Sequence, residues 1–102
     1  MYSAIRKYSI KPNFMDEVMQ RIQGEFLHII SREPGFTAYY AVCVGNNEVL
    51  TIIVFETQVG AEGSTPLAFE WVNKNLAGFI QEEPQTTVGW IFGSSFGPAS
   101  NE

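Results

Sequence analysis

Two consecutive segments of the chain, residues 36–44 and 49–55, are apolar on both of their alternating faces. Strands of this kind have to be covered on both sides, since a monomer rarely leaves an apolar patch of several hundred Å² in water. The turn-forming sequence Gly45-Asn46-Asn47-Glu48 separates the two segments and predicts an antiparallel hairpin. The rest of the fold must therefore cover two faces of a sheet.

A strand and a helix are predicted before the hairpin. Residues 2–10 alternate in side-chain character as a strand does. Residues 14–31 place nearly all of their apolar side chains on one side of a helix, with Asn13 as the expected N-cap. The sequence Arg32-Glu33-Pro34-Gly35 ends this helix, because the residue before a proline is pushed away from helical dihedral angles.

A second helix and a last strand are predicted after the hairpin. The helix is expected to begin near Gln58, behind a Thr57 cap, and to be bent or broken before Pro66. Beyond that point its apolar positions recur with the helical period until Glu82-Glu83-Pro84 ends it. The last strand runs from about residue 86 to residue 92.

The order β-α-β-β-α-β is typical of α+β proteins with a ferredoxin-like fold, in which two helices cover one face of a four-stranded antiparallel sheet. The other face still carries apolar side chains, and a second copy stacked against it would cover them. We therefore expect a homodimer through this sheet face, most simply with C2 symmetry. Residues 1–93 form the expected domain, and residues 94–102 form an expected flexible C-terminal tail.

Composition limits the partners and the compartment. A chain of 102 residues has room for one domain, and its net charge of −5 argues against nucleic acid as a partner. No segment approaches the roughly 20 apolar residues of a membrane span, and no apolar stretch follows the first charges as in a signal peptide. The lone Cys43 is expected to be a small apolar side chain rather than a reactive thiol. It fits a reducing compartment, so we expect a cytoplasmic protein.

Four segments resemble the antibiotic biosynthesis monooxygenase-like domains of the dimeric α/β-barrel superfamily, over about residues 2–92. They are residues 1–8 (MYSAIRKY), 34–40 (PGFTAYY), 54–57 (VFET) and 70–76 (EWVNKNL). The resemblance implies a dimeric α/β barrel. Activity does not follow from it, because the superfamily contains cofactor-free quinone-forming monooxygenases, haem-degrading enzymes and members of unknown function. This chain looks closest to the branch with no assigned activity.

The haem-degrading members differ from this chain at two of three positions. They use an Asn on the first strand, a Trp on the second helix and a haem-ligating His further along that helix. Here Arg6 takes the first position and Trp71 the second, but residues 72–83 contain no His. The resemblance therefore implies no haem, and we expect no cofactor. One His and one Cys with scattered carboxylates also make no typical metal site, so we expect no metal.

Arg6 and Tyr8 share one face of the first strand, in an otherwise apolar pattern. If this face looks toward the helices, Arg6 lies inside or at the mouth of a cavity, where a buried charge needs a partner. We favour a salt bridge to a carboxylate such as Glu56, and an anionic or phenolic ligand is the alternative. If the partner is such a ligand, Arg6 and Tyr8 are substrate-binding residues.

Tyr40 and Trp71 are the other candidate substrate-binding residues. Tyr40 lies on the Phe36 side of its strand and would line the same cavity, unless it is a core residue with a hydrogen-bonded hydroxyl. Trp71 lies well off the centre of the second helix's buried side, so it either flanks a ligand cleft or packs against neighbouring chain or the partner subunit. His28 is expected to be a partly solvated surface residue rather than a general base.

Three functions remain open at this point. The resemblance, with these polar and aromatic side chains, implies a cofactor-independent monooxygenase or related enzyme acting on a small aromatic or polyketide-like substrate. The second function is a non-catalytic dimer that binds a small hydrophobic ligand. The third is a structural dimer whose core is filled. Whether the protein is an enzyme at all is not decided by the sequence.

Overall fold

The structure is a computed structural model that describes residues 1–98. Its elements follow the expected order once three short helical pieces are taken as one segment. They are β1 (Tyr2–Ile10), α1 (Met15–Arg21), η1 (Ile22–Phe26), α2 (Leu27–Ile30), β2 (Phe36–Val44), β3 (Glu48–Phe55), α3 (Gln58–Asn75), η2 (Ala77–Phe79) and β4 (Ile80–Trp90). The chain thus has the βαββαβ order of a ferredoxin-like fold.

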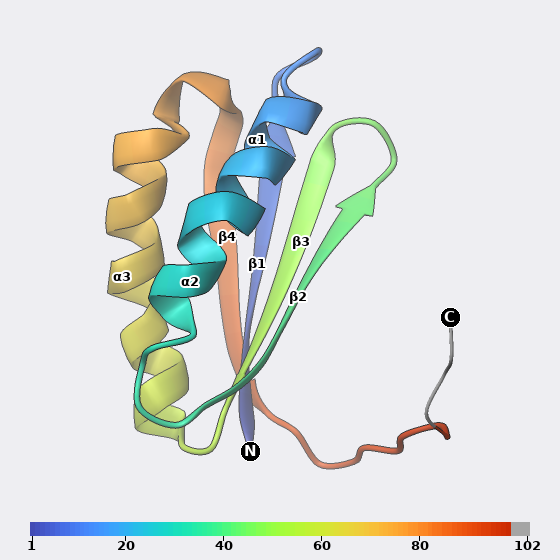
Figure 1. Ribbon diagram of the computed structural model, residues 1–102, viewed down its shortest axis with the longest axis vertical. Coiled ribbons are helices and arrows are strands. Elements are labelled where there is room, and N and C mark those ends of the chain that lie inside the picture. The colour runs from blue at the N-terminus through green and yellow to red at the C-terminus, as the bar shows by residue number, and fades with distance from the viewer. Residues whose placement is uncertain (99–102) are drawn as a thin grey trace.

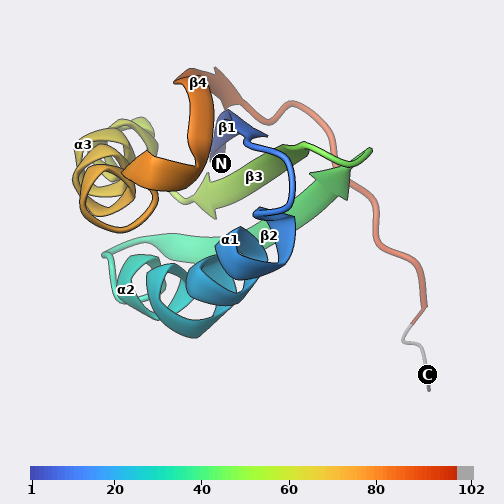
Figure 2. The same cartoon turned by 90° about the horizontal axis from the view of Figure 1, so that it is seen from above.

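The four strands form one antiparallel sheet in the order β2-β3-β1-β4. The α1–α2 segment and α3 lie side by side over one face of this sheet, and the other face carries no helix among residues 1–98 (Figures 1 and 2). The expected fold class is therefore confirmed. Because β1 is an inner strand, side chains that it points toward α3 lie in the middle of the domain.

The hydrophobic core lies between the sheet and the helices. Alternate side chains of β3 point into it, and on β1 the same alternation buries Ala4, Arg6, Tyr8 and Ile10. The largest fully buried apolar side chains are Phe55, Ile10, Ile30, Ile53, Leu76 and Val18. Arg6 thus occupies a position that elsewhere on the strand belongs to the core.

The second helix differs from its expected course at Pro66 and at its C-terminal end. α3 continues through Pro66, which was expected to bend or break it. A proline in a helix removes one hydrogen bond, here to the carbonyl of Glu62, and Glu62 is exposed so that water can replace the donor. α3 ends at Asn75, and β4 begins at Ile80 rather than near residue 86. Pro84 is tolerated within β4 because this is an edge strand with an irregular register.

The first helix begins at Met15, and the expectation that Asn13 caps it is wrong. Asn13 adopts a left-handed conformation with φ of 71°, and its side chain makes no cap hydrogen bond. η1 is a π-helical turn, in which each backbone hydrogen bond spans five residues instead of four. The expected Thr57 cap of α3 is confirmed, since its hydroxyl accepts from the backbone N–H of Gly60 at 3.1 Å.

A bulge near the start of β2 reverses the faces of the following residues. Phe36 pairs with Phe55, but after the register shift Tyr39 pairs with Ile53 and Tyr40 pairs with Ile52. Tyr39 therefore faces the helices, while Tyr40 lies on the opposite face and is 54% exposed. The expectation that Tyr40 shares a face with Phe36 is wrong, because a bulge inserts one residue and breaks the alternation.

The sheet face that carries no helix in this structure is partly apolar, and we call it the free sheet face. Its exposed apolar side chains are Ile5, Tyr40, Val42 and Val44. Beyond β4, residues 91–98 have no regular secondary structure, and the rest of the expected tail, residues 99–102, lies outside the described residues. In the part of the chain that the structure describes, no helix is long and apolar enough to cross a membrane.

Candidate functional site

A buried arginine lies between the sheet and α3. The side chain of Arg6 is 2% exposed, and its Nη2 donates to the hydroxyl oxygens of Ser64 at 2.9 Å and Thr65 at 3.1 Å. The hydroxyl of Ser64 in turn donates to the carbonyl of Ala61 at 2.6 Å. α3 therefore holds the guanidinium through two hydroxyl groups, neither of which carries a charge.

The charge of Arg6 has no counter-ion within residues 1–98. Its expected salt bridge to Glu56 is wrong, because Glu56 is exposed and the ion pairs of the described chain join other residues. Nη1 also has no hydrogen-bond partner among the described residues. Burial lowers the pKa of Arg6 below its ordinary value, and the nearby Tyr8 and Tyr39 oppose this change. An arginine nevertheless remains protonated, so the site holds a buried positive charge.

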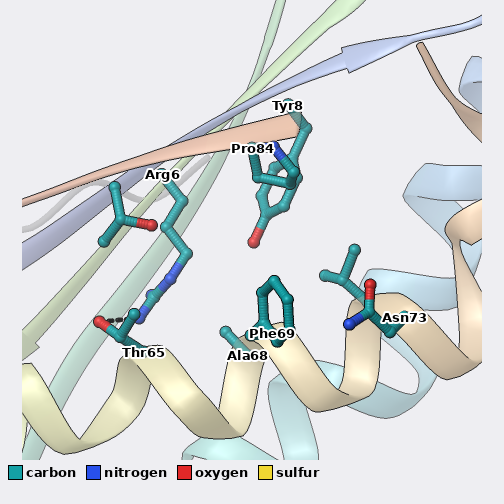
Figure 3. A pocket seen from close by; sticks show the side chains of 9 residues that line it. Arg6, Tyr8, Thr65, Ala68, Phe69, Asn73 and Pro84 are labelled. Carbon is teal, nitrogen blue, oxygen red and sulfur yellow. Dashed lines mark hydrogen bonds between the residues drawn. The ribbon is translucent and has the colours of Figure 1, made fainter. Parts of the chain in front are cut away.

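A small cavity of about 50 Å³ lies beside this charge. Arg6 and Tyr8 point into it from β1, Thr65, Phe69 and Asn73 face it from α3, and Pro84 closes one side (Figure 3). Its remaining lining residues are Ala68, Val72 and Thr86. A space of this size holds a few water molecules. It is therefore too small, in this structure, for a whole aromatic ligand.

Three hydroxyl groups lie on the inner side of this cavity. Tyr8, Tyr39 and Thr51 pack together with side chains of η1 and α3, and the space between them is too small for a water molecule. Thr51 stands directly opposite Arg6 in the register of β1 and β3. The Tyr39 oxygen is buried and finds no hydrogen-bond partner within residues 1–98, whereas the Thr51 hydroxyl lies within reach of the Tyr8 hydroxyl. A buried polar atom of this kind can donate or accept a hydrogen bond if a ligand or water reaches it.

Burial governs the ionisation of the two phenols. It raises the pKa of Tyr8 above 10.0, and the charge of Arg6 and the nearby Thr51 hydroxyl weaken this rise. Burial also raises the pKa of Tyr39, Tyr8 adds to this rise, and Arg6 opposes it. Both phenols are therefore neutral at pH 7 and are hydrogen-bond donors rather than bases. They can donate to the oxygen of an anion that Arg6 attracts.

The sequence-predicted site residues do not all meet. The structure brings Arg6 and Tyr8 together at the cavity, and Tyr40 lies on the far side of the sheet. Trp71 is 6% exposed and packs in the same group of side chains as Tyr8, Tyr39 and Thr51. Its ring packs on Phe26 at 5.1 Å between centroids, so it is chiefly a packing residue between α3 and η1. His28 is exposed, away from the cavity.

Four polar residues of the site were not predicted from the sequence: Tyr39, Thr51, Ser64 and Thr65. A signal existed for Thr51, because it is the one polar residue on the inward face of an otherwise apolar strand. Ser64 and Thr65 precede Pro66, where the helix was expected to be bent or broken, whereas the structure makes them an arginine-binding turn of a continuous helix.

Comparison with known proteins shows the fold. No protein-family model matches the sequence, and no curated protein matches it. A solved structure of a protein of unknown function from Nitrosomonas europaea is similar, with a TM-score of 0.77, 14% identity and 96% and 95% of the two chains covered. A Streptomyces coelicolor monooxygenase in complex with nanaomycin D has a TM-score of 0.75 and 14% identity, over 95% and 92% of the chains.

A third similar structure is a cofactor-independent oxygenase from Streptomyces nogalater, with a TM-score of 0.71, 9% identity and 91% and 94% of the two chains covered. The chain therefore has the fold of antibiotic biosynthesis monooxygenase-like domains, as the resemblance implied. Because proteins of this fold include members of unknown function, the fold does not by itself assign the activity.

Proposed function

We propose that this protein is a cofactor-independent monooxygenase, or a related enzyme, acting on a small aromatic substrate that ionises at a phenolic or enolic oxygen. One observation carries the proposal: a buried guanidinium without a counter-ion among residues 1–98 faces a cavity in a fold that monooxygenases share. A bound anion would supply the missing charge.

Arg6 and Tyr8 have distinct roles in this proposal. Arg6 lowers the pKa of the bound phenol or enol and holds its oxygen, and Tyr8 donates a hydrogen bond to the same end of the ligand. The resulting carbanion-like ring carbon reduces O₂ directly. In the overall reaction one CH₂ group and one O₂ give one carbonyl group and one water. The rest of the substrate needs more room than the cavity offers, so Phe69, which is exposed at the rim, must move on binding.

Oxygen uptake with dihydroxynaphthalene- and anthrone-type substrates tests the proposal. We expect consumption of O₂ by the wild type, loss of at least about 100-fold in kcat/KM in Arg6→Met, which corresponds to about 2.7 kcal/mol, and full activity in Lys74→Met. Lys74 is exposed, and within residues 1–98 its ion pair is with Glu70 on the outer side of α3, so it is a matched control for loss of a positive charge. The proposal would be contradicted if the wild type showed no oxygen uptake and bound none of these substrates.

A non-catalytic binder of small hydrophobic ligands is the second candidate, and the same buried charge supports it. It predicts that these compounds raise the melting temperature of the wild type but not of Arg6→Met, without any oxygen uptake. A purely structural role explains neither the cavity nor the buried hydroxyls that lack partners among residues 1–98.

The proposal includes a homodimer formed through the free sheet face. Ile5, Tyr40, Val42 and Val44 leave this face partly apolar and exposed, while the helices cover the other face. Two such sheets pack about 10 Å apart when their apolar faces meet. In this arrangement each substrate site lies on the helix side of its own sheet, away from the partner.

A further inference from the structure

We infer that residues 91–98, which we call the arm, dock as an added strand on the β2 edge of a second copy of this chain. Each copy then gives its arm to the other. This inference rests on the proposed homodimer, whose interface it extends from the free sheet face onto β2. It does not depend on the proposed activity.

The arm carries aromatic side chains that the described chain leaves uncovered. Phe92 is 88% exposed and Phe96 is 87% exposed, and Trp90, the last residue of β4, is 65% exposed. In an extended chain these three side chains lie on one side, and the odd-numbered positions of residues 93–97, on the other side, are glycine or serine. A segment that is aromatic on one side only is typical of a strand that packs on that side.

The two edge strands of the sheet differ in their protection against pairing with another strand. β4 carries Glu82, Glu83 and Pro84, and its register is irregular, which are features that block an edge. β2 has nine residues and contains neither a charged residue nor a proline between Phe36 and Val44. Its outer edge is therefore open to an added strand, which would bind through backbone hydrogen bonds.

A recess on the helix side of β2 offers a place for an aromatic ring. It has a volume of about 50 Å³, and its walls include Met19 and Ile22 of the α1–η1 segment and Ala41 and Cys43 of β2. A strand added to the β2 edge points every second side chain toward this side of the sheet. The aromatic side of the arm would then cover the recess, and its glycine and serine side would extend the free sheet face.

The distance between the two edges favours a second copy over the same chain. The arm follows β4, and β2 is the opposite edge strand, with β3 and β1 between them. Three strand spacings put the start of the arm about 14 Å from its own β2, and the arm spans at most about 26 Å when extended. More than half of it would therefore be used in crossing the sheet. In Figures 1 and 2 the arm instead leads away from its own sheet, and stacking of two free sheet faces brings the edges of two copies alongside each other.

Cys43 provides a direct test, because it lines the recess and is the one cysteine of the chain. Ser94 lies on the aromatic side of the arm, so a docked arm would bring a cysteine at this position near Cys43 of the second copy. Under mild oxidation we expect Ser94→Cys to form a disulfide-linked dimer in a yield at least about 10-fold above that of Val59→Cys. Val59 is the matched control, since it is 80% exposed but lies on α3. Adding Cys43→Ser to Ser94→Cys should remove the linked dimer.

Removal of the two aromatic rings tests how much the docked arm contributes to the dimer. We expect Phe92→Ser with Phe96→Ser to raise the dissociation constant of the dimer by about 100-fold in sedimentation equilibrium, because buried aromatic rings dominate the affinity of interfaces. Both rings are almost fully exposed in the single chain, so their loss leaves its core intact. Val59→Ser should leave the dissociation constant unchanged.

The outcomes separate the docked arm from the proposed dimer. An unchanged dissociation constant in the double variant, or a linked dimer no more abundant in Ser94→Cys than in Val59→Cys, would overturn the docked arm and leave the dimer through the free sheet face standing. A disulfide within one chain of Ser94→Cys would show that the arm docks on its own β2, and this would also overturn the exchange. A wild type that sediments as a monomer at micromolar concentration would overturn both.

Discussion

Nη2 of Arg6 donates to the hydroxyl of Ser64 at 2.9 Å, across 58 positions of the chain. The bond joins an inner strand of the sheet to the middle of α3 inside the core. Hydroxyl dipoles solvate the guanidinium only in part, and no carboxylate of residues 1–98 neutralises it. The free protein therefore carries a desolvation cost that a bound anion would reduce.

Replacing this arginine by an apolar residue of similar length should not destabilise the protein. We expect Arg6→Met to leave the free energy of unfolding unchanged or to raise it by about 1–2 kcal/mol, because a buried charge is removed and the volume is kept. Urea denaturation measures the effect. Lys74→Met is the control: Lys74 is exposed and pairs with Glu70 on the surface of α3, so a small loss is expected there. A loss above about 2 kcal/mol in Arg6→Met would show that the arginine is structural.

The fold could be predicted because the apolar periodicities are long and consistent. The doubly apolar hairpin and the one-sided helix together fixed the element order, and neighbouring elements agreed with one another. Errors occurred at single residues. Pro66 was expected to break a helix that instead continues, and Pro84 was expected to end that helix although it lies within a strand. Tertiary packing of α3 and the edge position of β4 outweigh these local preferences.

The site was predicted only in part, for two physical reasons. Arg6 and Tyr8 were found because alternation along one strand places them on a common face. Tyr40 was placed with them because a bulge leaves no clear mark in the sequence, and the structure puts Tyr39 there instead. The position of Trp71 was estimated from an ideal helix, but η1 brings Glu25 and Phe26 against it and so buries its ring.

Stability should fall at alkaline pH because of the buried phenols. The pKa of Tyr8 and Tyr39 is raised above 10.0 in the folded protein, so the unfolded chain loses these protons first. The unfolded state then binds fewer protons, and the free energy of unfolding falls by up to about 1.4 kcal/mol per pH unit for each phenol above pH 10. Urea denaturation between pH 8 and pH 11 should show that the free energy of unfolding falls less steeply with pH in Tyr39→Phe than in the wild type. The same dependence of the free energy of unfolding on pH in the wild type and in Tyr39→Phe would contradict this prediction.

The hydrogen bond between Trp71 and Glu25 should stabilise the packing of the two helical segments. Nε1 of the indole donates to Oε1 of Glu25 at 3.1 Å. In Glu25→Ala the partly buried indole N–H loses a charged acceptor, so we expect a loss of about 1–2 kcal/mol in the free energy of unfolding. Glu25→Gln keeps an acceptor oxygen and should lose less than about 0.5 kcal/mol. Equal losses in the two variants would show that the carboxylate acts through its charge and not through this bond.

Two glycines of α3 should respond in opposite ways to the same substitution. A Cβ at Gly63 would meet nothing within 4 Å, so Gly63→Ala should raise the free energy of unfolding by about 0.5–1 kcal/mol through helix propensity. At Gly60 it would approach Cδ1 of Phe55 at 3.1 Å and the Thr57 hydroxyl at 3.3 Å. Gly60→Ala should therefore destabilise the protein, by about 1–3 kcal/mol. Thermal denaturation of both variants checks the contrast, and a gain at Gly60 would contradict the packing described.

The free sheet face should form the dimer interface, and a charge placed on it should separate the subunits. We expect the wild type to sediment as a dimer at micromolar concentration and Val42→Lys to sediment as a monomer, because two related lysines in a closed interface cost several kcal/mol. Val42 is exposed in the single chain, so the substitution does not disturb its core. Val59→Lys is the matched control, since Val59 lies on α3, on the helix side of the sheet, and is 80% exposed. A wild type that sediments as a monomer, or a Val59→Lys variant that dissociates as Val42→Lys does, would contradict an interface on this face.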